Sequence, residues 1–292
     1  YVTAAFPFSS GEAFIAPEVQ GLIDAGHEIL LAPRSPRGEA LHAPAAARVA
    51  VREGLVSPLV ALAAARVATA QPLRAAGCTA ALLWSSARVR LSCFVKNCSI
   101  LPKALWLARV AETWGAEHIH AHWAGTTASL AWTAAAIAGI PWSFTAHRWD
   151  IVENNALAAK MAAASFARFI SDDGLRLARQ ACGGGGGNVR VIRMGVPIPA
   201  SAQFKPPSQP VFLCPANLTP IKGHRFLIDA WAMLGDSAAD AELWLAGAGE
   251  LDAALRARVR ELGIESRVRF LGAVPHERLL SMYASNRVSA VV

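Results

Sequence analysis

The sequence predicts an α/β protein made of two Rossmann-like domains, each with a parallel sheet between layers of helices. Strand-like and helix-like stretches alternate along all 292 residues, and a proline-rich stretch divides them into two series. The apolar content of 54% is sufficient for two cores and excludes a disordered chain. We therefore expect a first domain over 1–196, a linker over 197–210, and a second domain over 211–292 that is incomplete because the chain stops in a strand-like stretch.

The first series contains six expected strands and the helices between them. Strands are predicted at 1–5, 27–33, 118–123, 142–147, 168–171 and 188–196. Helices are predicted at 12–25, at several places within 55–114, at 127–138, and at 174–181, where Asp172 or Asp173 caps the first turn.

Proline, glycine and threonine set the expected helix boundaries. We expect the helices of 55–114 to break near Pro72, Gly77 and Pro102. Thr126 is a suitable N-cap and Gly139 a suitable C-cap for the helix between them.

The second series repeats the same alternation. Strands are expected at 211–218, 241–249, 267–274 and 288–292, and helices at 224–234, 250–262 and 275–284. Two such sheets predict a cleft between domains, with ligands at the carboxyl ends of the strands. The residues that directly follow each strand are therefore the candidate site residues.

Charge is unevenly distributed along the chain. The net charge is +7, but residues 34–109 contain eleven Lys and Arg against two acidic residues, a balance of +9. These cations alternate with apolar residues, which suits an anionic membrane surface, or they are ordinary solvated helix faces. No recognition motif accompanies the charge, so we expect no nucleic acid partner.

The five cysteines form no CxxC pair and are odd in number, which favours a reducing, cytoplasmic compartment. Tyr1 lies inside the first expected strand and Val292 inside the last. We therefore expect that segments are missing at both ends.

Three histidines alternate in "HIHAH", so they share one face of the strand. Three imidazoles at this spacing are able to bind zinc, but we expect no metal, because no carboxylate is placed to orient the rings. Since only the last residue of a parallel strand reaches the carboxyl edge, His118 and His120 are expected in the sheet core and His122 near the cleft.

Further candidates follow the other strands. His147 and Asp150 follow "WSFTA", and a histidine at a strand end facing a cleft is a functional candidate or a hydrogen-bonded edge residue. Ser10 and Gly11 lie at a strand-to-helix turn whose free N–H groups suit phosphate or sugar oxygens, or form an ordinary cap.

In the second series, Lys222 and Gly223 stand directly before a helix. An ammonium group beside helix N–H groups suits a diphosphate, although an exposed lysine is also ordinary. Gly249 and Glu250 form another glycine turn into a helix.

The ordered set of these stretches resembles the glycosyltransferase family 4 type of retaining GT-B enzyme. The resemblance lies in "FPFSSGEAFIAPEVQGLIDAGHEI", "HIHAHWAGTTASLAWTAAAIAGIPWSFTAHRWDI", "VRVIRMGV", "ANLTPIKGHRFLIDAW" and "LWLAGAGELDAALRARVRELGIESRVRFLGAVPHERLLSMYASN". It implies transfer of a sugar from a nucleotide-sugar donor to a polysaccharide or glycolipid acceptor, with retention of anomeric configuration and without metal or cofactor.

The resemblance also implies roles for individual residues. Catalytic positions are His147 and His122; donor and phosphate contacts are Lys222, Gly223, Asn217, Gly247, Gly249, Glu250 and Gly11; acceptor-side residues are Ser10, Glu12 and Asp150. His147 would position groups rather than act as a nucleophile.

Two departures from the family pattern are visible. Asn217 stands where many members have an arginine five residues before the lysine, and the family's E-x7-E segment would follow Val292. Two alternatives remain open: a truncated nucleotide-sugar-binding module without turnover, and a GT-B sugar-nucleotide epimerase, for which Glu12, Glu18 and Asp150 are the only candidate acid and base groups. We expect a cytoplasmic protein, peripheral on the inner membrane face through 34–109.

Overall fold

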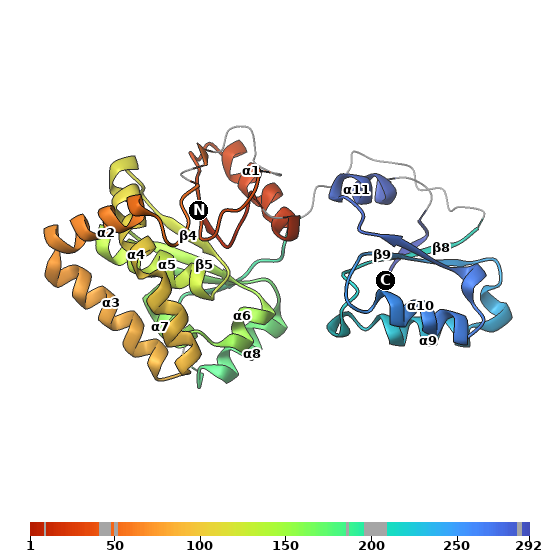
Figure 1. Cartoon of the computed structure of the whole chain (residues 1–292). Coiled ribbons are helices and arrows are strands. Elements are labelled where there is room, and N and C mark those ends of the chain that lie inside the picture. The colour runs from red at the N-terminus through yellow and green to blue at the C-terminus, as the bar shows by residue number, and fades with distance from the viewer. Residues whose placement is uncertain (9, 41–47, 50–51, 185–186, 196–208, 285–287) are drawn as a thin grey trace. The chain divides into compact units, whose positions relative to one another are not determined.

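The computed structural model confirms an α/β fold with two parallel sheets (Figure 1). It describes residues 1–8, 10–40, 48–49, 52–184, 187–195, 209–284 and 288–292. The chain divides into two compact units, Tyr1–Pro197 and Ile198–Val292. Most of the predicted linker, 197–208, lies outside the described residues.

The first unit contains a seven-stranded sheet in the order β3-β2-β1-β4-β5-β6-β7, with every described pairing parallel. Its strands are β1 (Val2–Thr3), β2 (Leu30–Pro33), β3 (Arg48–Val49), β4 (Ile119–His122), β5 (Trp142–Ala146), β6 (Phe166–Phe169) and β7 (Val189–Val191). Because β4, β5 and β6 are neighbours, their carboxyl ends lie side by side.

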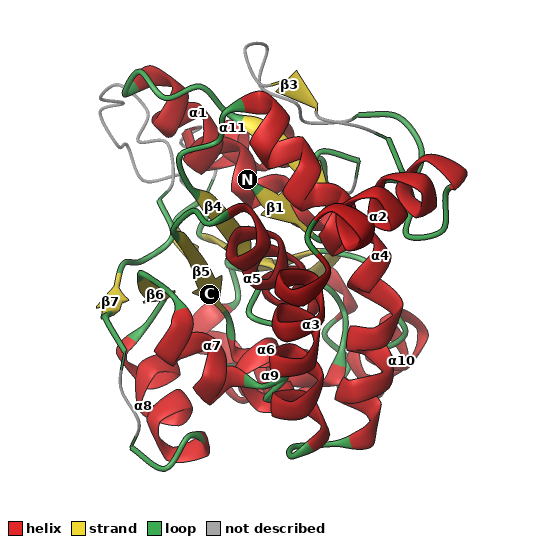
Figure 2. Ribbon diagram, turned by 90° about the vertical axis from the view of Figure 1, so that its left-hand side faces the viewer, coloured by secondary structure: helices red, strands yellow, loops and turns green. Residues whose placement is uncertain are grey.

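The first unit also contains helices, one of which packs on the central strands of this sheet. They are the 3₁₀ helix η1 (Ser10–Ile15), α1 (Ala16–Asp24), α2 (Pro58–Ala70), α3 (Pro72–Ala87), α4 (Leu91–Trp114), α5 (Thr126–Ala138), α6 (Arg148–Glu153), α7 (Leu157–Ala163) and α8 (Asp172–Ala181). Helix α5 packs on β4 and β5 and against α4 (Figure 2). Ten residues of α5 are buried, so it lies at the centre of the core.

The two faces of the central strands differ in polarity. Ile119, Phe144 and Phe169 belong to the main hydrophobic core. The residues that alternate with them are polar, such as Ser143 and Thr145. Alternation of this kind is typical of a sheet with one face packed on helices. It leaves a polar face on which a site can form.

Several predicted helix boundaries were wrong. Gly77 lies inside α3. Pro102 lies inside α4, because one lost backbone hydrogen bond does not break a 24-residue helix that packs on α2, α3 and α5. The N-cap of α5 is Gly125, one residue before the predicted Thr126. The Thr126 hydroxyl instead accepts a hydrogen bond from Arg34 Nη1.

The first and last helices of this unit also begin elsewhere than predicted. Residues 10–15 form a 3₁₀ turn, and α1 begins only at Ala16, with Pro17 in its first turn. Helix α8 begins at Asp172, and its cap is Ser171, whose hydroxyl accepts from the Gly174 N–H at 3.1 Å.

The second unit contains a four-stranded parallel sheet in the order β10-β9-β8-β11. Its elements are β8 (Val211–Pro215), η2 (Pro220–Lys222), α9 (His224–Met233), η3 (Gly235–Ala238), β9 (Glu242–Ala246), α10 (Asp252–Glu261), η4 (Glu265–Arg267), β10 (Val268–Gly272), α11 (His276–Ala284) and β11 (Ala290–Val291). All four strands predicted for this part are confirmed, in shorter form.

Among the described residues, no helix combines the length and the apolar character needed to cross a bilayer.

Candidate functional site

A pair of histidines connects the ends of two neighbouring strands. His122 is the last residue of β4, and His147 directly follows β5. Their Nε2 atoms lie 2.8 Å apart, so one proton is shared between the two rings. Burial lowers the pKa of His122 to about 2 and that of His147 to about 4, with a further contribution from Arg168 to each. Both rings are therefore neutral at physiological pH.

The pair continues into a chain of hydrogen bonds toward α1. The hydroxyl of Tyr1 lies 3.0 Å from Nδ1 of His122 and donates to Oε1 of Glu18 at 2.6 Å. The other carboxylate oxygen of Glu18 accepts from Arg168 Nη1 at 2.5 Å. Arg168 comes from β6, so three elements, α1, β4 and β6, contribute to one continuous network together with Tyr1 and His147. Sequence reasoning missed Tyr1 and Arg168 entirely.

Glu18, His120 and His122 have side-chain atoms within 4.8 Å of one another, as a metal site requires. Their existing contacts oppose metal binding. His120 already bonds Ser143 Oγ at 2.7 Å and Thr145 Oγ1 at 3.0 Å through its two nitrogens. Glu18 pairs with an arginine, and both nitrogens of His122 have partners. The absence of a metal remains a prediction that these contacts favour.

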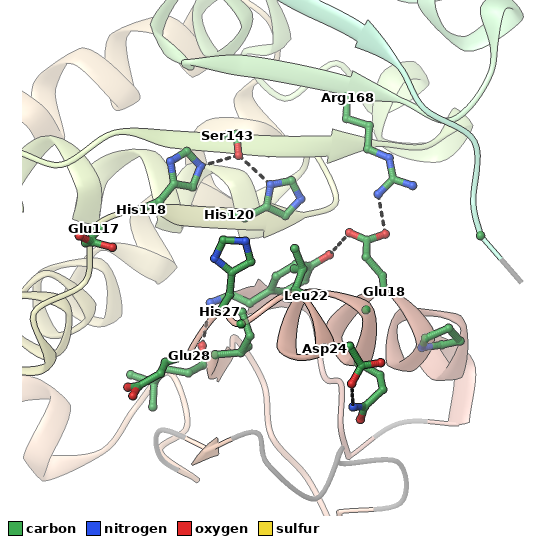
Figure 3. Close-up of a pocket in the computed structure, with 18 of the residues that line it drawn as sticks. Glu18, Leu22, Asp24, His27, Glu28, Glu117, His118, His120, Ser143 and Arg168 are labelled. Atoms are coloured by element: carbon green, nitrogen blue, oxygen red, sulfur yellow. Dashed lines mark hydrogen bonds and ion pairs between the residues drawn. The ribbon is translucent and has the colours of Figure 1, made fainter. Parts of the chain in front are cut away.

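A pocket of about 1170 Å³ opens beside this network, on the polar face of the sheet (Figure 3). His118, His120 and Arg168 line it from the strands, and Glu18 lines it from α1. The prediction that His118 lies in the sheet core was wrong. Its side chain is exposed in this pocket and bonds Ser143 Oγ at 2.7 Å, because His118 precedes β4 and faces the cavity between the strands and α1.

Glu12 holds the loop that follows β1. It is 5% exposed, and its carboxylate accepts from the backbone N–H groups of Ala5 and Phe6, each at 2.6 Å. It also accepts from Trp123 Nε1 at 2.5 Å. Glu12 thus fixes the loop after β1 to the residue that follows β4. Its predicted acceptor-side role is untested.

Asp150 fixes the loop after β4 to the loop after β5. Its carboxylate accepts from the backbone N–H of His147 at 2.7 Å and from that of Ala124, and the bond to His147 lies at the start of α6. Burial raises the pKa of Asp150 to about 6. Nearby, the Lys160 ammonium donates to the carbonyls of Ala124 and Gly125, and burial lowers its pKa to about 7.

A second pocket, of about 650 Å³, lies at the carboxyl ends of β1 and β4. Predicted residues in its lining are Gly11, Glu12 and Asp150, and it also contains Arg34 and Arg90, which were not predicted. The first unit thus brings three of the predicted residues into one cavity. The Ser10 side chain lies outside what the structure describes.

In the second unit, Lys222 ends the 3₁₀ turn η2 and Gly223 precedes α9. Gly223 has φ +70°, a conformation that favours glycine. The Lys222 side chain is exposed, and His224 beside it is buried. A flexible cation therefore stands next to the N-terminus of a ten-residue helix, where the helix dipole also favours an anion.

The loops after β8 and β9 pack directly on each other. Leu218 N–H donates to the carbonyl of Ala248 at 3.0 Å. A Cβ on Gly247 would lie 2.0 Å from the Ala216 carbonyl oxygen, and one on Gly249 would lie 2.4 Å from the Leu218 carbonyl oxygen. Both glycines are thus required by close backbone approach. The predicted residues Asn217 and Glu250 have exposed side chains on these same loops.

Comparison with known proteins finds a match to one family model and similarity to several solved structures. Residues 200–292 match the family model "Glycosyl transferases group 1". This match covers about a third of the chain. No curated protein matches the chain.

Among solved structures, the lipopolysaccharide outer core galactosyltransferase WaaB in its apo form is 16% identical, with 99% of this chain and 72% of that chain covered and a TM-score of 0.61. A glycosyltransferase from Rickettsia africae ESF-5 is 12% identical, with 97% and 69% covered and a TM-score of 0.55. The alignment with a mutant of TarM from S. aureus covers 48% of this chain and 30% of that chain. Its TM-score of 0.41 is too low to support an argument. The similarities to WaaB and to the Rickettsia africae glycosyltransferase confirm the GT-B fold class, and the part of the chain that matches the family model lies in the second unit.

Proposed function

We propose that the full-length protein transfers a sugar from a nucleotide-sugar donor to a saccharide or lipid-linked acceptor. The single observation that carries this proposal is the family match over 200–292, which includes Lys222 and the glycine turns at strand ends. In this proposal Lys222 and the first N–H groups of α9 bind the donor diphosphate, and Gly223 allows close approach. Asn217, Gly247, Gly249 and Glu250 border the nucleotide.

We also propose that the reaction retains anomeric configuration and needs no metal. The carboxylates of the first-unit site support this, because each is already engaged: Glu12 and Asp150 with backbone N–H groups, and Glu18 with an arginine. None is placed as a free nucleophile. The charge of the leaving diphosphate would be neutralised by Lys222 and the helix dipole instead, and its oxygen would accept the proton of the attacking hydroxyl.

The first unit would hold the acceptor. The pocket that contains Gly11, Glu12 and Asp150 is the proposed acceptor site, and Ser10 belongs to the same turn. Trp149, which also lines this pocket, is 68% exposed and offers a flat apolar surface on which a sugar ring packs well. His147, with His122 behind it, would position the reacting groups.

The segment 34–109 would contact an anionic membrane from the cytoplasmic side. On α2 and α3, Leu59, Leu73 and Trp84 are exposed, and the guanidinium of Arg88 lies 4.5 Å above the Trp84 ring. Exposed apolar side chains between cations suit a surface with acyl chains below anionic headgroups. Sedimentation with vesicles that contain anionic lipid, compared with neutral vesicles, tests this contact.

A product assay tests the main proposal. The full-length protein is titrated with UDP, GDP and their sugars, and is then incubated with donor and candidate acceptors in the presence of a chelator. Sugar transfer supports the proposal. Nucleotide binding without product supports the binding-module alternative, and a donor converted to its epimer supports the epimerase alternative.

A further inference from the structure

The hydrogen-bond network that ends at His147 determines which ring nitrogens carry protons as well as the position of the ring. Its members are Arg168, Glu18, Tyr1, His122 and His147, and each contacts the next through a hydrogen bond of 2.5–3.0 Å. Each contact needs one donor and one acceptor, so the charge state at one end determines where every proton lies.

Glu18 fixes the direction at the first end. It accepts from Arg168, whose side chain is 9% exposed and whose Nε and Nη2 also donate to the carbonyls of Ile192 and Arg193 at 2.9 and 3.0 Å. Guanidinium groups remain charged in proteins, so Glu18 is the ionised partner and accepts only. The single hydroxyl proton of Tyr1 must therefore point to Glu18.

This places a proton on Nδ1 of His122. Because the Tyr1 oxygen gives its proton to Glu18, it can only accept from His122 at 3.0 Å. His122 is 0% exposed and lies near Arg168, so burial and repulsion hold it neutral and lower its pKa. A neutral ring with a proton on Nδ1 has none on Nε2.

The proton between the two rings then belongs to His147. It donates from Nε2 to the bare Nε2 of His122 across 2.8 Å, and its own Nδ1 is bare. The charge at the Arg168 end of the network thus determines the position of every proton in it.

We infer that Tyr1, Glu18 and Arg168 are positioning residues that act through His122 to hold His147 as a neutral ring with its proton on Nε2. His147 then cannot give that proton to a leaving group, and its Nδ1 serves only as an acceptor. The meaning of this arrangement for catalysis rests on the proposed function, but the arrangement itself does not.

Histidine ¹⁵N NMR of the full-length protein tests the inference. The nitrogen shifts report which ring nitrogen carries the proton, and the His122→Gln and His147→Gln variants assign the signals. The expected result is Nδ1–H for His122 and Nε2–H for His147. The opposite pair of tautomers in the unmodified protein would overturn the inference without any variant.

The Tyr1→Phe variant supplies the second measurement. Without the hydroxyl, Nδ1–H of His122 is a buried donor without an acceptor, so the proton should move to Nε2 and both rings should change tautomer together. The chain's other tyrosine gives the matched control: Tyr283→Phe, in the second unit, should change neither ring. A folded Tyr1→Phe protein with unchanged tautomers would contradict the inference.

An activity measurement separates this inference from the proposed function. If the protein transfers sugar, Tyr1→Phe should lower kcat at least tenfold and leave KM for the donor within about twofold, because the donor phosphates bind elsewhere. Unchanged kcat would show that the tautomer has no catalytic role. If the unmodified protein transfers nothing, the proposed function fails, and the NMR result still decides the inference.

Discussion

Gly247 lies against the carbonyl of Ala216 so closely that a Cβ at position 247 would stand 2.0 Å from the oxygen. Real Cβ atoms do not approach backbone oxygen this closely, so the loops after β8 and β9 need glycine to remain together. The same loops carry Asn217 and Glu250, which are proposed to contact the nucleotide. Close backbone packing and the proposed donor site therefore depend on the same residue.

Replacing Gly247 by alanine should destabilise the second unit by roughly 1–3 kcal/mol, because the new methyl group forces the two loops apart. Hydrogen exchange measures the change, at the β8 and β9 amides for this variant and at the α3 amides for its control. Gly77→Ala is the matched control: position 77 has no atom within 4 Å of a new Cβ and lies inside α3, so the change should stabilise by about 0.5–1 kcal/mol. Equal effects at the two positions would refute the close-approach argument.

The three histidines of β4 should differ in their contribution to stability. His122→Ala leaves the Nε2–H of His147 without its acceptor, so it should cost roughly 1–3 kcal/mol for that unsatisfied donor, while the Tyr1 hydroxyl keeps its bond to Glu18. His118→Ala removes one hydrogen bond at an exposed position, so it should cost much less than 1 kcal/mol. Urea denaturation of the two variants measures the difference. A large loss at His118 would show that the polar face of the sheet is covered in the full-length protein.

Stability should fall as the pH drops below 6.5. In the folded protein, burial lowers the pKa values of His120, His122 and His147 to about 3, 2 and 4 from an ordinary value of 6.5. At pH values between the folded-state pKa and the ordinary pKa, the unfolded chain therefore binds more protons than the folded chain. Each histidine adds a slope of about 1.4 kcal/mol per pH unit to the free energy of unfolding. The raised pKa of Asp150, about 6, acts in the opposite direction below pH 6.

The net effect is a loss on the order of 3 kcal/mol between pH 6.5 and pH 5. Denaturant titrations at several pH values measure it, and His147→Gln should show a shallower slope because one of the three buried imidazoles is gone. A free energy of unfolding that is constant from pH 7 to pH 5 would mean that these histidines are not buried as neutral rings.

Donor binding and turnover should respond to different residues. Lys222→Ala should weaken binding of the nucleoside diphosphate roughly 10- to 150-fold, the equivalent of one lost charged hydrogen bond of about 1.5–3 kcal/mol. His147→Ala should leave that affinity nearly unchanged and lower kcat. Calorimetric titration and steady-state kinetics of the full-length protein measure both. Arg260→Ala, an exposed cation on α10, is the control for net charge and should change neither.

Local patterns predicted most of the order of elements but missed β3, α6 and α7. The alternation of "HIHAH" and "WSFTA" predicted β4 and β5, and the position of His147 after its strand predicted its place at the sheet edge. Helix breaks were predicted poorly, because the effect of Pro102 depends on the tertiary packing of α4, and a single residue does not reveal that packing.

The network around His122 was not predictable from local sequence, because its members are distant. Glu18 and Arg168 are 150 positions apart, and only the parallel order β1-β4-β5-β6 brings them together. One signal was present: Arg168 is a charged residue inside the otherwise apolar strand "FARF", and a nearly buried arginine needs an acid partner. That pattern predicts a partner without identifying it.

The anomeric configuration of the product decides whether the protein is a retaining, metal-independent glycosyltransferase. The full-length protein is incubated with an α-linked nucleotide sugar, an acceptor and a chelator, and the anomeric proton of the product is examined by NMR. The expected product is α-linked and forms at the same rate with and without chelator. A β-linked product, or transfer that stops when divalent metal is removed, would contradict it.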